Sequence, residues 1–324
     1  MKRSPHQKIR SEDFSNMKKV YITILNYNTH DKTIECIKSL KKLKTRGIDL
    51  NVVLIDNNSK EKFEIDENDY SDINLVFIKN EENLGFSGGH NMGFSYALEH
   101  GADFVVPLNS DTIVDESLIE ELIKPFERDD RVGITVPKIY FAKGSEFHKG
   151  RYKKEDLGNV IWYAGGITDW NNVISSHRGV DEVDRGQYDE IFNTEFATGA
   201  CFMISCEVLK RVGMFDDKYF LYYEDGDLNV RVKKAGYKIL YTPKAFLWHS
   251  NAGSGGGSGS SLQDYYITRN RLLFGFSHAP LRAKLALLRE SIRVFKNGRE
   301  WQKRGVRDFY FRKFGKGSFF EKVS

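Results

Sequence analysis

The sequence is poor in cysteine and in long apolar runs, and each shortage excludes a class of protein. Its three cysteines, Cys36, Cys201 and Cys206, show no C-x-x-C pair or Cys/His spacing. Neither a disulfide framework nor a zinc site is therefore predicted, and a reducing cytoplasm fits best. No stretch approaches the roughly 20 apolar residues that cross a bilayer, and the polar start lacks the apolar core of a signal peptide. We expect a cytoplasmic protein whose membrane contact, if any, is peripheral at the inner face.

The chain also lacks a large excess of either charge: it has 49 Lys and Arg against 45 Asp and Glu, a formal net charge of +4. The segment from Arg269 onward is visibly basic, yet no nucleic-acid-binding motif accompanies it. We therefore expect no nucleic-acid partner. At 324 residues with 40% apolar content, the chain can bury a sizeable core as one large domain with a tail, or as two small domains.

Alternating apolar runs and helical periodicity in the first half predict a doubly wound α/β sheet. The expected strands are 20–25, 52–55, 75–78 and 104–108, and the expected helices are 31–43, 91–100 and 115–126. Ligands of such sheets bind outside the carboxyl ends of the strands. The segments 26–28, 56–59, 83–93 and 109–111, rich in Asn, Asp or Gly, fall there.

The second half is less regular. Residues 141–195 are polar and weakly periodic, which predicts long loops that shape a substrate pocket. A buried element is expected at 196–209, a short helix at 227–235 and a strand at 237–248. The Gly/Ser tract at 251–261 is equally typical of a domain linker and of a mobile active-site loop next to His249.

Two of the polar segments could bind a nucleotide. The glycine-rich stretch 83–93 could bring backbone N–H groups to a phosphate at a helix start, although it matches neither G-x-G-x-x-G nor a Walker loop. A purely structural turn is equally compatible. Asp56 could accept a hydrogen bond from N3–H of uracil or thymine, or could simply belong to a capped turn.

The acidic residues suggest chemistry. Asp111 at a strand end, with His249, could hold a hard divalent cation beside a diphosphate leaving group. Each taken alone is more often a helix cap or an ordinary buried histidine. Of Glu224, Asp225 and Asp227, one could be a general base and another a helix cap or the partner of a basic side chain such as Arg231; spacing does not choose.

These segments occur in the order seen in glycosyltransferase family 2, and they most resemble its rhamnosyltransferase-like branch. The resemblance covers about residues 20–274 and rests on YITILNYN (21–28), LIDNNS (54–59), ENLGFSGGHNMG (82–93), LNSD (108–111), TGA (198–200), VGMFD (212–216), YEDGDL (223–228) and WH (248–249).

The resemblance implies a GT-A fold, with a mostly parallel central sheet flanked by helices. It implies inverting transfer of a sugar, with rhamnose from dTDP-rhamnose favoured, onto a glycan or lipid-linked oligosaccharide in cell-surface polysaccharide synthesis. The expected domains are a flexible start (1–17), a catalytic domain (18–277) with nucleotide-binding (18–115) and acceptor-binding (116–277) halves, and a basic helical tail (278–324). The alternatives are a UDP-sugar-dependent transferase, a nucleotidyltransferase and a non-catalytic carbohydrate-binding protein.

By the same resemblance, Asp225 would be the catalytic base with Glu224 beside it, and Asp111 and His249 would bind Mg²⁺ or Mn²⁺. Asn109-Ser110-Asp111 has one carboxylate where the family often has two, which predicts weaker metal binding. Nucleotide-sugar contacts are expected from Asn26, Tyr27, Asn28, Asp56, Asn83, Gly85, Gly88, Gly89, Asn91, Asn109 and Ser110, and sugar contacts from Trp162, Thr198, Gly199, Ala200 and Tyr223.

The basic tail contains an amphipathic pattern. Its apolar positions are Leu281, Leu285, Leu288, Ile292 and Phe295, interleaved with Arg and Lys. Such a helix could lie on an anionic membrane near a lipid-linked acceptor. It could equally pack on the catalytic domain or on a second subunit, giving a homodimer.

Overall fold

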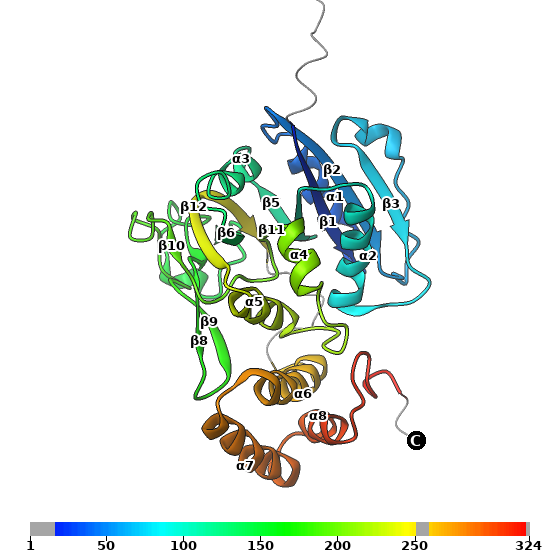
Figure 1. The fold of residues 1–324 in the computed structure, drawn as a ribbon, viewed down its shortest axis with the longest axis vertical. Helices are drawn as coiled ribbons and strands as arrows, with labels where there is room; N and C mark the ends of the chain where they lie inside the picture. Colours follow the sequence, from blue (N-terminus) through cyan, green and yellow to red (C-terminus); the bar gives the residue numbers. More distant parts are fainter. Residues whose placement is uncertain (1–16, 251–258, 322–324) are drawn as a thin grey trace, which may run out of the picture.

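The computed structural model describes residues 17–250 and 259–321. The expected flexible start and most of the 251–261 tract lie outside the described residues. Figure 1 shows a central sheet flanked by helices, with the C-terminal helices grouped at one end. Among the described residues, no helix is long and apolar enough to span a bilayer.

The sheet has the strand order β10-β12-β6-β11-β4-β1-β2-β3, with β5 paired to β12 and β7 to β6. The pairs β1 with β2, β1 with β4, β2 with β3 and β6 with β12 are parallel, which confirms the mostly parallel sheet. The strands are β1 (Lys18–Asn26), β2 (Ile48–Asp56), β3 (Leu75–Lys79), β4 (Phe104–Asn109), β5 (Thr112–Val114), β6 (Val132–Phe141), β7 (Ile161–Tyr163), β10 (Phe192–Asn193), β11 (Met203–Ser205) and β12 (Lys238–His249), with a separate hairpin of β8 (Gly166–Asp169) and β9 (Ile174–His177).

The helices cover the sheet and then form a separate C-terminal group. Helix α6 ends at the expected domain boundary near residue 277, and α7 contains the predicted amphipathic segment. The α-helices are α1 (His30–Leu40), α2 (Gly85–Glu99), α3 (Leu118–Ile123), α4 (Cys206–Val212), α5 (Glu224–Lys234), α6 (Ser261–His278), α7 (Leu281–Asn297) and α8 (Glu300–Tyr310), and short 3-10 turns lie at Glu67–Ile73 and Lys149–Arg151.

Helix α2 begins six residues earlier than the sequence predicts, and its glycines explain why. A Cβ at Gly89 would lie 2.4 Å from a methyl carbon of Leu25, and one at Gly93 would lie 2.6 Å from Thr23 Cγ2. These glycines let α2 lie directly on β1, so packing overrides their poor helix propensity. The stretch is therefore helix from Gly85 onward rather than a turn that precedes a helix.

Strand β6 was not among the expected strands. It is buried along almost its whole length, but Pro137 and Lys138 interrupt its apolar pattern. The buried Lys138 ammonium lies 2.7 Å from Asp184 and 2.6 Å from Asp189. A charged residue is accommodated in a central strand because two carboxylates neutralise it.

Candidate functional site

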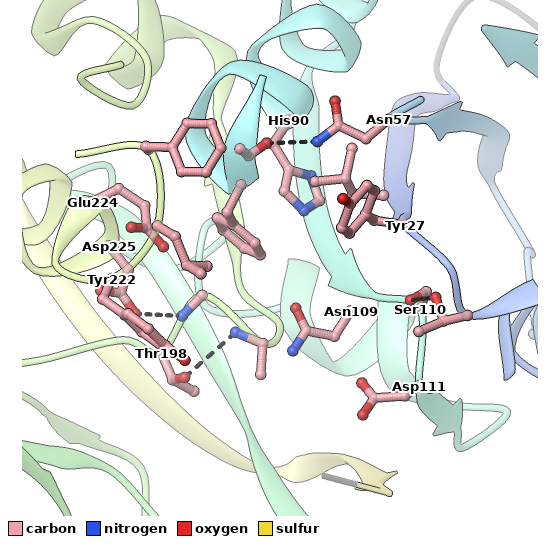
Figure 2. A pocket seen from close by; sticks show the side chains of 18 of the residues that line it. Tyr27, Asn57, His90, Asn109, Ser110, Asp111, Thr198, Tyr222, Glu224 and Asp225 are labelled. Atoms are coloured by element: carbon pink, nitrogen blue, oxygen red, sulfur yellow. Dashed lines mark hydrogen bonds between the residues drawn. The ribbon is translucent and has the colours of Figure 1, made fainter. Parts of the chain in front are cut away.

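A cavity of about 520 Å³ lies where the ends of β1, β4 and β12 meet the start of α5. This volume is within the range of small-molecule sites. Figure 2 shows Asn109 and Asp111 on one side and Glu224 and Asp225 on the other. The predicted site residues that line the cavity are Tyr27, Asn83, Gly85, Asn109, Ser110, Asp111, Trp162, Thr198, Gly199, Ala200, Glu224, Asp225 and His249.

Seven predicted residues are not in the cavity lining: Asn26, Asn28, Asp56, Gly88, Gly89, Asn91 and Tyr223. Asn26 and Asp56 are buried against each other, because Asn26 Nδ2 donates to Asp56 Oδ1 at 2.7 Å. Asp56 also accepts from the Ser59 hydroxyl at 2.6 Å. The Asp56 carboxylate thus already accepts hydrogen bonds from Asn26 and from its own turn. Recognition of a nucleotide base by Asp56 stays a prediction.

Three of the others support the packing of α2. Gly88 and Gly89 lie in this helix, Gly89 against Leu25 of the sheet. Asn91 donates to the Phe215 carbonyl at 2.9 Å and to Asp217 at 2.7 Å. Asn91 therefore ties α2 to the segment before α5 instead of facing the cavity.

The first backbone N–H groups of α2, which the sequence offers as a phosphate cradle, already have acceptors. Those of Phe86 and Ser87 lie 2.6 and 3.3 Å from the Phe220 carbonyl oxygen. That of Gly85 donates to Asn83 Oδ1 at 2.8 Å. In this conformation the helix start holds residue 220, and phosphate binding there stays a prediction.

Asp111 and His249 form a pair on one wall of the cavity. Antiparallel pairing of β5 with β12 sets His249 opposite Thr112, the neighbour of Asp111. Asp111 Oδ1 consequently lies 3.0 Å from His249 Nε2, and Asn109 Nδ2 lies 3.4 Å from the same nitrogen. The carboxylate oxygen suits either Mg²⁺ or Mn²⁺, whereas the imidazole nitrogen suits the transition metal Mn²⁺ better than the harder Mg²⁺. The described residues contain no group of three or more such ligands, so substrate oxygens or water would supply the other positions.

Trp162 lines the cavity beside this pair. Its ring meets the rings of His249 and His177 edge to face, at centroid distances of 4.7 and 4.3 Å. Burial lowers the pKa of His177 to about 4, so its ring is neutral at physiological pH, and Nδ1 lies 3.1 Å from the Trp162 carbonyl. The sequence predicted Trp162 but missed His177, which lies on a short strand with no local signal.

Glu224 and Asp225 form the opposite wall. Asp225 Oδ2 accepts the Gly199 N–H at 2.8 Å and Oδ1 accepts the Gly226 N–H at 2.7 Å. Glu224 Oε2 is buried without a hydrogen-bond partner among the described residues. Burial raises the pKa of both carboxyls, and the negative charge of Asp225 raises that of Glu224 further. Two carboxyls with perturbed pKa values in a cavity are typical of a catalytic site.

Asp227 has a different environment. Its carboxylate lies 2.7 Å from Arg231 Nε, the partner that the spacing offers, and 2.6 Å from His278 Nε2 of α6. Although burial opposes it, these contacts hold the pKa of Asp227 below its usual range. Asp227 is therefore part of the packing between α5 and α6.

The aromatic run before Glu224 has an unusual backbone. Phe220, Tyr222 and Tyr223 have φ values of 66°, 70° and 74°, a left-handed conformation that costs bulky residues energy. Asn270 of α6 donates to the carbonyl oxygens of Tyr219, Leu221 and Tyr222 at 2.7 to 2.8 Å. The chain thus stabilises the strained loop from a helix about 50 residues away.

The C-terminal region also reaches the cavity. Leu262 of α6 and Phe320 line it beside Phe220 and Tyr222. None of these four was among the predicted site residues. The predicted Tyr223 points elsewhere, because its hydroxyl lies 3.1 Å from the Val173 carbonyl.

Comparison with known proteins agrees with the motifs. The model of a family described as Glycosyl transferase family 2 matches residues 21–213. The low-salt glycan biosynthesis hexosyltransferase Agl10 of Haloferax volcanii is 26% identical over 253 residues, which cover 78% of this chain and 74% of the relative. The dTDP-rhamnosyl transferase RfbF of Shigella flexneri is 22% identical over 271 residues, covering 81% and 82%. An N-acetylglucosaminyl-diphospho-decaprenol L-rhamnosyltransferase of Mycobacterium tuberculosis is 27% identical over 155 residues, about half of each chain.

A solved structure shows the same fold. GalNAc-T7, crystallised with UDP, GalNAc and Mn²⁺, superposes with a TM-score of 0.64 at 18% identity and covers 95% of this chain. This chain spans 57% of the length of that one. The likeness shows the GT-A fold that the motifs predict.

Proposed function

Because this chain belongs to glycosyl transferase family 2, we propose that it is a metal-dependent inverting glycosyltransferase. It moves a sugar from a nucleoside diphosphate to a hydroxyl group of a glycan or lipid-linked acceptor in cell-surface polysaccharide synthesis. One observation carries the proposal: the Asp225 carboxylate, held by two backbone N–H groups, lines the same cavity as the Asp111 and His249 pair.

Asp225 is the proposed general base. Its two hydrogen bonds from Gly199 and Gly226 fix the plane of the carboxylate, and each oxygen keeps a lone pair for a substrate hydroxyl. The acceptor proton passes to Asp225 while the acceptor oxygen bonds to the anomeric carbon. The bond from that carbon to the diphosphate oxygen breaks in the same displacement, which inverts the configuration. Asp225 must be ionised to accept the proton, so its raised pKa sets a lower pH limit for activity.

Asp111 and His249 are proposed to bind the cation on the donor side. A bound Mn²⁺ or Mg²⁺ would neutralise the charge that develops on the departing diphosphate. Asn109 Nδ2 lies close to His249 Nε2 and could donate to a diphosphate oxygen once that nitrogen binds metal. Trp162 packs on the His249 ring and restricts its orientation.

The favoured donor is dTDP-rhamnose, because two of the relatives described above carry rhamnosyl transferase names. The name of a third relative specifies only a hexosyltransferase, and a UDP-sugar is the alternative donor. The three cysteines are all buried and free, which suits the reducing cytoplasm where such donors would be used.

Donor turnover with a panel of sugar nucleotides tests the proposal. The full chain is incubated with Mn²⁺ and dTDP-rhamnose, UDP-glucose, UDP-N-acetylglucosamine or GDP-mannose, and release of nucleoside diphosphate is followed with and without candidate acceptors. One donor should raise the unfolding temperature and be consumed. Proton NMR of the glycoside, recorded early in the reaction, should show an anomeric configuration inverted relative to that of the donor. Asp225→Asn is the matched control, since it should bind the donor without consuming it.

The same assay separates the rivals. Release of pyrophosphate would identify a nucleotidyltransferase. Binding of free sugars without consumption of any donor would identify a carbohydrate-binding protein. Retention of configuration would contradict the single displacement at Asp225.

A further inference from the structure

One face of α7 exposes a continuous row of large apolar side chains. Leu281, Leu285, Leu288, Ile292 and Phe295 have exposed fractions of 72%, 49%, 38%, 52% and 55%. They recur every three or four residues, so they share one side of the helix. This row is called the α7 stripe below. Among the described residues the stripe does not pack on the catalytic domain, which was one of three possibilities that the sequence left open.

The stripe is separate from the face that α7 buries in the protein core. Ala283 and Leu287 are buried in a cluster with residues of α6 and α8. The contact with α6 is close enough that a Cβ at Gly275 would lie 2.2 Å from Leu287 Cδ1. Arg271 of α6 also pairs with Glu290 at 2.7 Å. These contacts fix the rotation of α7 about its axis and leave the stripe outside.

We propose that the α7 stripe docks the protein onto an anionic lipid surface. Arg282, Arg289, Arg293 and Lys296 are exposed and follow one side of the stripe, and Lys284 lies on its other side. The single acidic residue of α7, Glu290, already pairs with Arg271. An apolar strip bordered by cations is the pattern of a helix that lies in the membrane interface, with apolar side chains among the acyl chains and cations at anionic headgroups.

The charges favour lipid over a second copy of the chain. The alternating spacing of the stripe would also suit a paired-helix seam, in which residues beside the seam face those of the partner helix. Here the bordering residues are cationic, so a self-pairing of α7 would bring like charges together. An anionic surface instead neutralises them.

The location of the stripe relates it to the cavity. The C-terminal region that carries α7 also supplies Leu262 and Phe320 to the cavity wall. Docking through α7 would concentrate the enzyme at the surface that holds a lipid-linked acceptor. This last step rests on the proposed function, whereas the docking itself does not.

Vesicle co-sedimentation without any sugar nucleotide tests the docking, so its failure is distinguishable from failure of the proposed function. The full chain should sediment with vesicles of phosphatidylcholine and phosphatidylglycerol, much less with phosphatidylcholine alone, and less as salt increases. Leu285→Glu with Ile292→Glu should abolish sedimentation. Arg289→Gln with Arg293→Gln should weaken it roughly 25-fold, about fivefold for each cation lost.

The matched control places the same two charges elsewhere. Val180 and Ile191 have exposed fractions of 40% and 50%, so Val180→Glu with Ile191→Glu should sediment like the wild type. Thermal unfolding should show that all variants are folded. Unchanged sedimentation of Leu285→Glu with Ile292→Glu would overturn the proposal. So would a wild-type dimer that binds no vesicles and that the same variant dissociates, because the stripe would then be a subunit interface.

Discussion

The two walls of the cavity are built in different ways. One wall, called the metal wall after its proposed role and defined as Asn109, Asp111 and His249, lies at or next to strand ends of the sheet. The acid wall, defined as residues 220–225, consists of a loop and a helix start with three left-handed aromatic residues. The first gets its geometry from neighbouring strands. The second depends on residues 269 and 270 of α6, which follow it by about 50 residues in the chain.

The difference shows where the cavity stores strain. Each left-handed bulky residue costs on the order of 1–3 kcal/mol. Asn270 and Arg269 are both fully buried and donate four hydrogen bonds of 2.9 Å or less to this loop and the residue before it, two to the Tyr219 carbonyl oxygen and one each to those of Leu221 and Tyr222. We therefore expect changes in α6 to impair the acid wall and to spare the metal wall.

The largest expected effect is a difference in turnover between substitutions of two aspartates of α5. Asp225→Asn removes the proposed base and should lower turnover roughly 10²–10⁴-fold with little loss of donor affinity. Asp227→Asn should retain turnover but lower the free energy of unfolding by about 2 kcal/mol, because the contacts with Arg231 and His278 weaken. Initial rates and denaturant unfolding of both variants test this. Full turnover in Asp225→Asn, with loss in Asp227→Asn, would reverse the assignment.

The metal wall gives the next largest effect. Asp111→Asn should lower turnover roughly 10²-fold, the scale for losing one electrostatic contact to a developing charge. It should also raise the Mn²⁺ concentration that gives half-maximal rate, since one ligand is weakened. Removing metal with EDTA should stop the wild type, and adding Mn²⁺ should restore it. Full activity in EDTA, or an unchanged Mn²⁺ dependence in the variant, would argue against a metal site there.

A smaller effect tests the remote support of the acid wall directly. Asn270→Ala removes one hydrogen-bond donor from each of three carbonyl oxygens, of which that of Tyr219 keeps Arg269 as a donor, so the loop before Glu224 should shift. Turnover should fall roughly 10- to 100-fold, since small misplacements of catalytic groups are costly. The Mn²⁺ dependence should stay as in the wild type, because Asn270 donates its hydrogen bonds to the loop before Glu224. Ser277→Ala, on the exposed end of α6, is the matched control and should change neither. A raised Mn²⁺ requirement in Asn270→Ala would show that the walls are coupled.

The difference between the two walls also explains which site residues could be predicted from the sequence. Asp111 and His249 follow apolar strands, and parallel strand ends meet at one edge of a sheet, so both were predicted and both line the cavity. Gly88 and Gly89 lie inside a closely packed helix that the sequence did not predict there, because glycine marks close packing as well as turns, and their contact with a nucleotide stays a prediction. Asn270 carried no readable signal. Its role depends on strained carbonyl groups far away in the chain, and strain of this kind leaves no local pattern.

The smallest expected effect concerns the stability of the fold. Glu224 and Asp227 should change the free energy of unfolding with pH in opposite directions. The pKa of Glu224 is raised well above 4.5, mainly by burial. The folded protein therefore binds this proton more tightly than the unfolded chain, and stability present below pH 4.5 is lost as pH rises through the raised pKa. Asp227 has a lowered pKa, so its contribution has the opposite sign and is lost as pH falls through that pKa.

Glu224→Gln should remove only the loss of stability that Glu224 causes as pH rises. Its free energy of unfolding should decline less than that of the wild type as pH rises above 4.5, and the remaining decline should come from Asp225, whose pKa is also raised. Denaturant unfolding across that pH range measures the difference, with Glu207→Gln on the exposed side of α4 as the matched control. Parallel curves for wild type and Glu224→Gln would mean that Glu224 is ionised at little cost in the folded protein. The Glu224 carboxyl would then be better solvated than its burial in the structure implies.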